Sequence, residues 1–285
     1  MHRIQDVATP LEIGSFEHRG SRLAYEVHGT GDRTLVYLHG LLMDSQMNRG
    51  LAEALAEQGV RVALLDLLGH GRSDKPLQAS AYRMDSYADE VVAFLDHLGI
   101  DRAVIGGVSL GADVALQVVV RAPERVAGLL LEMPVLEWAV PTAAMLFTPL
   151  LLAMHYASGP AGLVARLLRR VPRTGMGSID SVLEALSAPP EVVKAVLHGI
   201  LTGPVAPTVE QRRAIAVPML VIAHTSDLIH PFSDAKRLVD IVPQGRLLPA
   251  RSIFELRVTP KRLTGEIAAF LREGASGLSA APAAG

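Results

Sequence analysis

A serine between two glycines is the first candidate for chemistry in this sequence. In the pentapeptide Gly-Val-Ser-Leu-Gly, Ser109 lies between Gly107 and Gly111 and matches the pattern G-x-S-x-G. An apolar run at 102–108 precedes it and a helical pattern at 110–121 follows, so we expect a sharp strand-to-helix turn at the serine. Such a turn exposes the hydroxyl, and the glycines avoid collisions with neighbouring backbone. The alternative is a serine that only caps the helix.

Apolar strand patterns alternate with amphipathic helical patterns around this turn. Strands are expected at 12–18, 22–28, 34–40, 60–67, 102–109, 125–133, 217–224 and 245–250, and helices at 45–59, 84–100, 110–124, 231–243 and 259–273. This alternation predicts an α/β fold with a mostly parallel sheet covered on both faces. The first two strands form an antiparallel hairpin.

Residues 137–210 interrupt the alternation with apolar, proline-punctuated, mostly helical sequence. We interpret them as a helical cap inserted after the sixth strand, over the C-terminal ends of the strands, where open α/β sheets bind ligands. The remaining residues 12–136 and 211–273 would form the core. The tail 274–285 is rich in Gly, Ala, Ser and Pro and is expected to be disordered.

With these motifs in place, the sequence resembles the α/β-hydrolase fold family over residues from about 12 to 273, in particular serine-nucleophile members of the esterase and lactonase type. "LHG" is similar to the family's oxyanion segment and contains His39 and Gly40. The resemblance implies that the backbone N–H groups of Leu41 and Leu110 form the oxyanion hole.

The resemblance also implies an acid. "VIAHTSDLIHP" is similar to the end of the strand that carries the triad acid, which makes Asp227 that acid, and the order nucleophile, acid, base agrees. Epoxide hydrolases and haloalkane dehalogenases of this fold use an aspartate as nucleophile. Ser109 therefore implies acyl transfer from esters, lactones, thioesters or activated amides.

The histidine expected in the loop after the last strand is missing. That loop reads "PARSIFELRVTP", with Ser252 at or beside the histidine position, and the last histidine of the chain is His230. The absence matters because a neutral serine hydroxyl needs a base to take its proton, and a second serine cannot do this near neutral pH.

Several residues could replace the missing base. His230 follows Asp227 by three residues, and two more histidines, His155 and His198, lie in the expected cap. Glu255 lies in the right loop but would need burial to act as a base. Each of these histidines also has a plain structural interpretation. Glu132 is an alternative acid, but we favour a capping or salt-bridged role for it. His224, at the end of a strand, is interpreted as structural, and His39 and His70 as residues that shape loops.

Three functions remain open on this basis. The first is a serine-dependent acyl hydrolase with an atypical triad, acting on a lipophilic small molecule in an apolar cap pocket. The second is a small-molecule binding or sensor protein on the same fold, favoured by the missing base. The third is a cofactor-free lyase or cyclase.

The composition of the chain excludes several classes of binding partner and cofactor. The 285-residue chain has a formal net charge of −2 and no cysteine, so we expect no nucleic acid partner, no thiolate chemistry and no Cys-based metal site. No histidine spacing suggests a metal site, no cofactor motif appears, and no signal peptide is recognised. Residues 138–165 carry no charged side chain, but their prolines and glycines argue against stable membrane insertion. We expect a cytoplasmic protein, and self-association into a homo-oligomer is left open.

Overall fold

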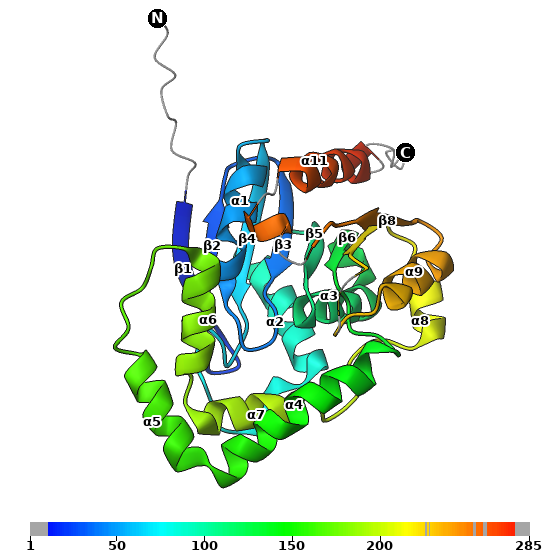
Figure 1. Cartoon of the computed structure of the whole chain (residues 1–285). Helices are drawn as coiled ribbons and strands as arrows, with labels where there is room; N and C mark the ends of the chain where they lie inside the picture. The colour runs from blue at the N-terminus through cyan, green and yellow to red at the C-terminus, as the bar shows by residue number, and fades with distance from the viewer. Residues whose placement is uncertain (1–10, 226, 228, 253–254, 259–260, 277–285) are drawn as a thin grey trace, which may run out of the picture.

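An eight-stranded sheet forms the centre of the protein (Figure 1). The computed structural model describes residues 11–225, 227, 229–252, 255–258 and 261–276. The strand order is β1-β2-β4-β3-β5-β6-β7-β8. The strands are β1 Leu11–His18, β2 Ser21–His28, β3 Arg33–Leu38, β4 Val60–Asp66, β5 Ala103–Val108, β6 Val126–Glu132, β7 Met219–Ala223 and β8 Gly245–Pro249.

The sheet is mostly parallel, as the sequence predicted. Strands β3 to β8 pair in parallel, whereas β1 pairs antiparallel with β2 and β2 antiparallel with β4. Every residue of β5, β6 and β7 is buried, which explains why these strands read as continuous apolar runs rather than alternating ones. Their carboxyl ends meet at one edge of the sheet.

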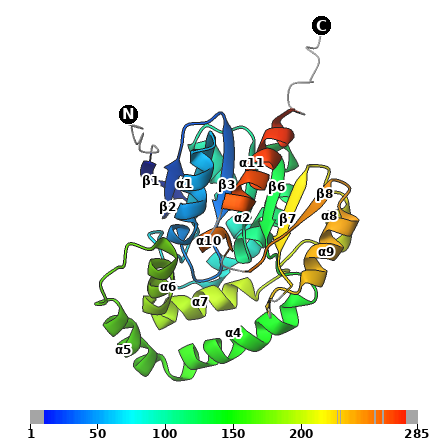
Figure 2. The ribbon, with the colours of Figure 1, turned by 45° about the horizontal axis from the view of Figure 1, so that its top comes forward.

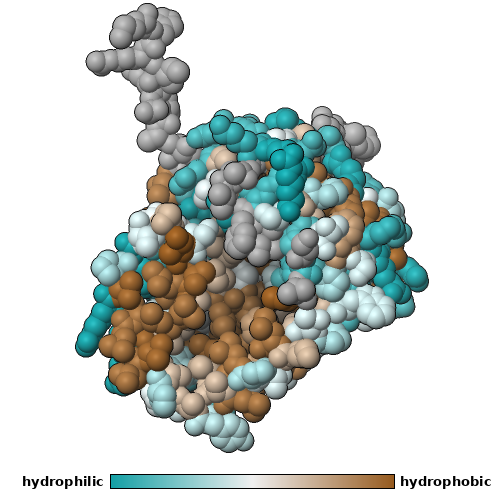
Figure 3. All heavy atoms as spheres, viewed as in Figure 1, coloured by the Kyte–Doolittle hydropathy of each residue, from teal (hydrophilic) through white to brown (hydrophobic). Residues whose placement is uncertain are grey.

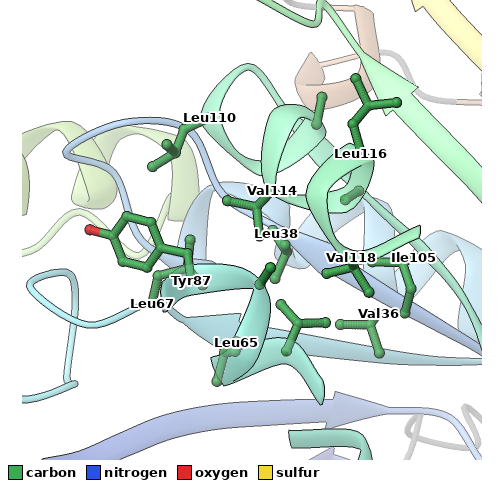
Figure 4. Close-up of a cluster of buried hydrophobic side chains, with 14 of the residues drawn as sticks. Val36, Leu38, Leu65, Leu67, Tyr87, Ile105, Leu110, Val114, Leu116 and Val118 are labelled. Carbon is green, nitrogen blue, oxygen red and sulfur yellow. The ribbon is translucent and has the colours of Figure 1, made fainter. Parts of the chain in front are cut away.

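Helices cover both faces of the sheet. α2 (Met84–His97), α3 (Leu110–Arg121) and α9 (Phe232–Ile241) contribute to one hydrophobic core. α1 (Arg49–Ala56) and α11 (Lys261–Ser276) contribute to the other. Figure 4 shows the first core beneath α3, where side chains of this helix point toward strands β3 and β5 and toward Tyr87 of α2. This packing fixes the start of α3, which carries the serine.

Five helices separate β6 from β7, at the position expected for the cap. They are α4 Ala139–Tyr156, α5 Ser158–Leu168, α6 Gly177–Ser187, α7 Pro190–Ile200 and α8 Val209–Arg213. In Figures 1 and 2, α4 to α7 lie together at one end of the sheet, and α7 packs against α4. Among the described helices only α4 is long and apolar enough to cross a membrane, a test that core helices of soluble proteins also pass. The division into core and cap domains remains a prediction.

The remaining elements are short. 3-10 helices lie at Ser45–Asn48, Ala79–Tyr82 and Pro123–Arg125, and α10 spans Glu255–Val258. Thus "PARSIFEL", expected to be a loop, includes the start of a helical turn. α11 continues to Ser276, beyond the expected start of the tail at 274, and residues 277–285 lie outside the described part of the chain.

Candidate active site

The backbone at Ser109 is strained in the way a sharp strand-to-helix turn requires. Its φ is 53° and its ψ is −112°, values that a non-glycine residue rarely adopts. The turn is held because the Ser109 N–H donates to the carbonyl of Glu132 at 2.8 Å. A Cβ on Gly107 would lie 2.7 Å from the carbonyl carbon of Gly111, and one on Gly111 would lie 2.6 Å from the carbonyl oxygen of Leu38. Both positions therefore require glycine.

His230 joins the serine to the acid. Its Nε2 lies 3.0 Å from Ser109 Oγ, and its Nδ1 lies 2.8 Å from Asp227 Oδ2. The tautomer with the proton on Nδ1 satisfies both contacts, because Nδ1–H then donates to the carboxylate and Nε2 accepts from the hydroxyl. The three side chains are thus joined by hydrogen bonds from the Ser109 hydroxyl through the imidazole to the Asp227 carboxylate.

A local turn brings the acid and the imidazole together. Asp227 Oδ1 accepts hydrogen bonds from the backbone N–H groups of Ile229 at 2.8 Å and His230 at 3.0 Å. The carboxylate therefore stabilises a tight turn between Asp227 and His230. Pro231 then caps α9, whose first residue is Phe232. The short spacing between Asp227 and His230 is thus the cause of their contact.

Asp227 is held as a carboxylate. Burial by itself would raise the pKa of this carboxyl group, but hydrogen bonds from the side chain and backbone of His230, and the charge of its imidazole, lower the pKa to about 2. His224 Nε2 lies 3.3 Å from the same oxygen, Asp227 Oδ2, and its ring is buried. A permanent negative charge can therefore stabilise a protonated His230.

The other two histidines considered as bases lie elsewhere. His155 is exposed at the end of α4, where its ring packs edge-on against Tyr156 with centroids 4.7 Å apart. His198 is exposed on α7. Neither residue lines the cavity that contains Ser109.

Both alternative carboxylates are paired with arginine. Glu255 accepts from the N–H of Arg251 and from Arg262, and the hydrogen bond to Arg262 lowers its pKa, the reverse of what a carboxylate base needs. Glu132 accepts from Arg257 at 2.8 Å and from the hydroxyl of Tyr37 at 2.7 Å. These contacts agree with the structural interpretation of Glu132 and Glu255.

The segment around Ser252 is attached to the sheet by an ion pair. Arg257, on the short helix α10 that follows Ser252, pairs with Glu132 at the end of β6, and both side chains are buried. Residues 253 and 254, part of the stretch where the family histidine was expected, lie outside the described residues. The imidazole that contacts Ser109 is that of His230, which lies in the loop after β7.

The two loop-shaping histidines support the segment beside the serine. His39 Nε2 accepts the Leu67 N–H at 3.1 Å, and its Nδ1 lies 2.9 Å from the carbonyl of Gly40. Its ring contacts that of His70 with centroids 4.7 Å apart. Burial lowers the pKa of both histidines, so they stay neutral and hold this loop by hydrogen bonds.

The N–H groups expected to form the oxyanion hole are available. Those of Leu41 and Leu110 donate no hydrogen bond to any other residue in the part of the chain that the structure describes. Both residues line the same cavity as Ser109. Their role as oxyanion donors remains a prediction.

The cavity above Ser109 is apolar and has a volume of about 280 Å³. Its wall is formed by strand ends, by α3, α4 and α7, and by the loop that contains Ile229 and His230. The lining residues from the inserted helices and the segment after α7 are Val140, Ala143, Ala144, Phe147, Thr148, Leu197, Ile200, Leu201 and Val205. Such a wall suits a lipophilic ligand with a reactive group at the Ser109 end.

Asp113 is a cavity residue that the sequence reasoning missed. Its Oδ1 accepts the N–H of Val135 at 3.0 Å, and Oδ2 has no hydrogen-bond partner among the described residues. Burial raises the pKa of this carboxyl well above its usual value, which favours its protonated form. A signal was present in the sequence, since Asp113 is the only polar residue in the apolar first part of the helical pattern, residues 110–116.

Within the described residues no group of three histidine, aspartate or glutamate side chains could hold a metal ion. The polar residues that line the cavity are Ser109, His230, Asp113 and Thr148. What this arrangement can do by itself is accept a proton from the serine and bind an apolar group beside it.

Comparisons with known proteins agree with this geometry. A family profile described as the alpha/beta hydrolase fold matches residues 33–179, just over half of the chain. The solved structure of Est816, described as an N-acyl homoserine lactone degrading enzyme, is 26% identical with a TM-score of 0.69, over 90% of this chain and 100% of that one. The enol-lactonase from Burkholderia xenovorans LB400 is 20% identical with a TM-score of 0.72, over 91% of this chain and 100% of that one, and shows the shared fold.

Curated relatives match over shorter lengths. The dihydrolipoyllysine-residue acetyltransferase component of an acetoin cleaving system from Pseudomonas putida is 43% identical over 114 residues, which are 39% of this chain and 30% of the relative. A haloalkane dehalogenase from Mycolicibacterium paratuberculosis is 31% identical over 121 residues, 42% of this chain and 40% of the relative. The chain thus matches less than half the length of these relatives. The profile match, the sheet and the serine turn together show that the chain belongs to the alpha/beta hydrolase fold family.

Proposed function

We propose that the protein is a serine-dependent acyl hydrolase that cleaves esters or lactones of lipophilic small molecules. The observation that carries the proposal is the continuous contact from Ser109 Oγ through His230 to Asp227, with distances of 3.0 and 2.8 Å. In this proposal Ser109 is the nucleophile, His230 the base and Asp227 the orienting acid.

The reaction would proceed in two acyl transfers. Ser109 Oγ attacks the substrate carbonyl carbon while its proton moves to His230 Nε2, and Asp227 stabilises the imidazolium. The tetrahedral oxyanion would be bound by the N–H groups of Leu41 and Leu110. The alcohol oxygen leaves with the proton from Nε2, and water then attacks the acyl-enzyme by the same route to release the acid. With a lactone, alcohol and acid are one product.

The substrate class follows from the cavity. Its wall is apolar apart from the four polar residues already named, so binding would depend on burying hydrocarbon. The likeness to a lactone-degrading enzyme at 26% identity supports ester or lactone carbonyls as the reactive group. Relatives named haloalkane dehalogenase are less informative for chemistry, because the family's dehalogenases use aspartate where this chain has Ser109.

The non-hydrolytic alternative rested on the missing histidine after β8. With His230 at hydrogen-bond distance from Ser109, a base is available and the hydrolase is favoured. A binding protein would have no need of the strained backbone at Ser109, which costs about 1–3 kcal/mol.

The test is covalent labelling with a fluorophosphonate, read by intact mass. We expect rapid addition of one probe to the wild type, none to Ser109→Ala, and strongly slowed addition to His230→Ala. His155→Ala and His198→Ala are matched controls and should label like the wild type. Failure of folded wild type to label, or undiminished labelling of His230→Ala, would reject the proposal.

A further inference from the structure

The inserted helices expose an apolar surface that the proposed reaction does not explain. Figure 3 shows apolar residues gathered over α4 to α7 on the face viewed in Figure 1. The exposed large apolar side chains of α4 to α6 and the segments beside them are Trp138, Val140, Met145, Leu146, Leu152, Tyr156, Leu163, Val164, Leu167, Val171, Met176, Ile179, Val182 and Leu186. Contiguous apolar surface of this kind marks an interaction site.

Helix α4 shows that this exposure extends beyond the side that lines the cavity. Val140, Ala143 and Phe147 lie on one side of the helix and line the cavity. Met145 is 77% exposed and Tyr156 is 80% exposed, and both point away from that side, as their positions along the helix require. A helix that is apolar on both sides is expected to be covered on both sides.

A cationic edge borders the apolar surface at the end of α5. Residues 139–187 contain four arginines, Arg166, Arg169, Arg170 and Arg173, and two acids, Asp180 and Glu184. Asp180 is buried, and Glu184 pairs with Arg173. The edge is therefore positive although the whole chain has a net charge of −2.

The arginines and the exposed leucines alternate at the end of α5 and in the turn that follows it. Arg166 follows Leu163 by three residues on α5, so these two side chains are neighbours on the helix. Arg170 follows Leu167 by three in the turn after the helix, where the Arg170 N–H donates to the carbonyl of Leu167. The side chains of Leu163, Leu167, Arg166 and Arg170 are exposed, and the guanidinium of Arg170 has no hydrogen-bond or ion-pair partner among the described residues. Apolar side chains bordered by arginines are typical of helices that lie in a membrane interface.

We propose that α4, α5 and α6 dock the protein on the surface of an anionic phospholipid bilayer. Apolar side chains would enter the interface, and the four arginines would contact lipid phosphates. This is peripheral docking and not a membrane span. A second copy of the chain fits the surface less well, because a dimer interface would include the positive charge of both cationic edges without supplying an opposite charge, whereas anionic lipid neutralises them.

Docking would also connect the bilayer with the proposed active site. Val140 and Leu201 line the cavity and are nevertheless 41% and 59% exposed. The apolar wall of the cavity is thus continuous with the exposed surface. A lipophilic molecule dissolved in the bilayer could enter without crossing water.

The test is co-sedimentation of the full chain with vesicles of phosphatidylcholine, with or without phosphatidylglycerol. We use the Ser109→Ala protein, so that the result does not depend on catalysis. We expect binding only to the anionic vesicles, weakened by salt because the arginine contacts are screened. Arg166→Glu/Arg170→Glu should weaken binding by about fivefold or more for each arginine, and Leu163→Asp/Leu167→Asp should abolish it.

Matched controls change similar residues elsewhere on the surface. Ile13 on β1 is 60% exposed and Arg33 on β3 is exposed, so Ile13→Asp and Arg33→Glu should leave vesicle binding unchanged. Light scattering measures the oligomeric state of every variant. The proposal is overturned by absent vesicle binding, by binding that survives both double substitutions, or by a dimer that Leu163→Asp/Leu167→Asp dissociates without any binding to vesicles.

Discussion

His230 and Asp227 belong to one turn, and this makes the site unusual at the level of single residues. The acid accepts the backbone N–H of the histidine as well as the N–H of its ring. Any displacement of the loop therefore moves the Asp227 carboxylate and the His230 imidazole together relative to Ser109. By contrast, the arrangement implied by the family resemblance takes the histidine from a separate loop after β8.

Replacing Asp227 tests whether the shared turn serves catalysis. Asp227→Asn keeps the size of the side chain and an oxygen for the backbone N–H groups, but removes the charge that stabilises imidazolium. We expect kcat for a lipophilic ester to fall about 10⁴-fold, with KM little changed. Because the pKa of Asp227 is lowered to about 2, its carboxylate should remain charged over the whole pH range in which the enzyme is assayed.

The control for this measurement is Glu255→Gln, which changes a carboxylate outside the arrangement and should leave kcat unchanged. An Asp227→Asn enzyme with nearly full activity would remove Asp227 from the proposed mechanism.

At the scale of elements, α10 is held to the sheet by a buried ion pair rather than by a catalytic contact. Arg257 and Glu132 are 7% and 4% exposed, and the hydroxyl of Tyr37 on β3 completes the cluster. Glu132 also accepts the N–H of Ser109 through its carbonyl, so the end of β6 supports the serine turn and anchors α10. A buried charge is tolerated only while its opposite charge is beside it, so the stability of this region requires both Arg257 and Glu132.

Breaking this pair should therefore cost more than losing a surface ion pair. We expect Arg257→Ala to lower the free energy of unfolding by about 3–5 kcal/mol, because Glu132 would remain buried without its counter-charge. Arg257→Met/Glu132→Gln should recover most of the loss, since neither residue is then charged. Urea unfolding measures both variants, and a loss of less than about 1 kcal/mol for Arg257→Ala would place the pair among weakly contributing surface pairs.

At the scale of the whole molecule, burial of the sheet on both faces leaves titratable groups inside the protein. Glu90 on α2 lies within the core on one face and accepts the N–H of Leu68 at 3.0 Å. Burial raises its pKa to about 8, although that hydrogen bond acts in the opposite direction. Glu90 is thus protonated in the folded protein at neutral pH and ionised in the unfolded chain.

This difference predicts how stability changes with pH. Between about pH 4.3, the ordinary pKa of glutamate, and pH 8, the folded state binds one proton more than the unfolded state, so stability falls as pH rises. Glu90→Gln removes this dependence and keeps an acceptor for Leu68. We expect the difference in unfolding free energy between variant and wild type to grow across this interval and to level off above pH 8. A constant difference would contradict the raised pKa.

Much of this protein could be determined from its sequence alone. The alternation of buried strands and amphipathic helices was readable because burial repeats every two residues in a half-buried strand and about every 3.6 in a helix. Ser109 and its two glycines were readable because the turn is a local structure with local steric demands. The proximity of His230 to Asp227 followed from three residues of spacing.

What only the tertiary structure decided depends on distant segments. Ser109 and His230 are 121 positions apart, and nothing in the sequence between them says which of several histidines will meet the serine. The same holds for Asp113, whose pKa is raised by burial among other elements, and for α4, whose two apolar sides look alike in the sequence. Hydrophobic periodicity identifies the side of an element that avoids water, but the partner that covers it is chosen by how the whole chain packs.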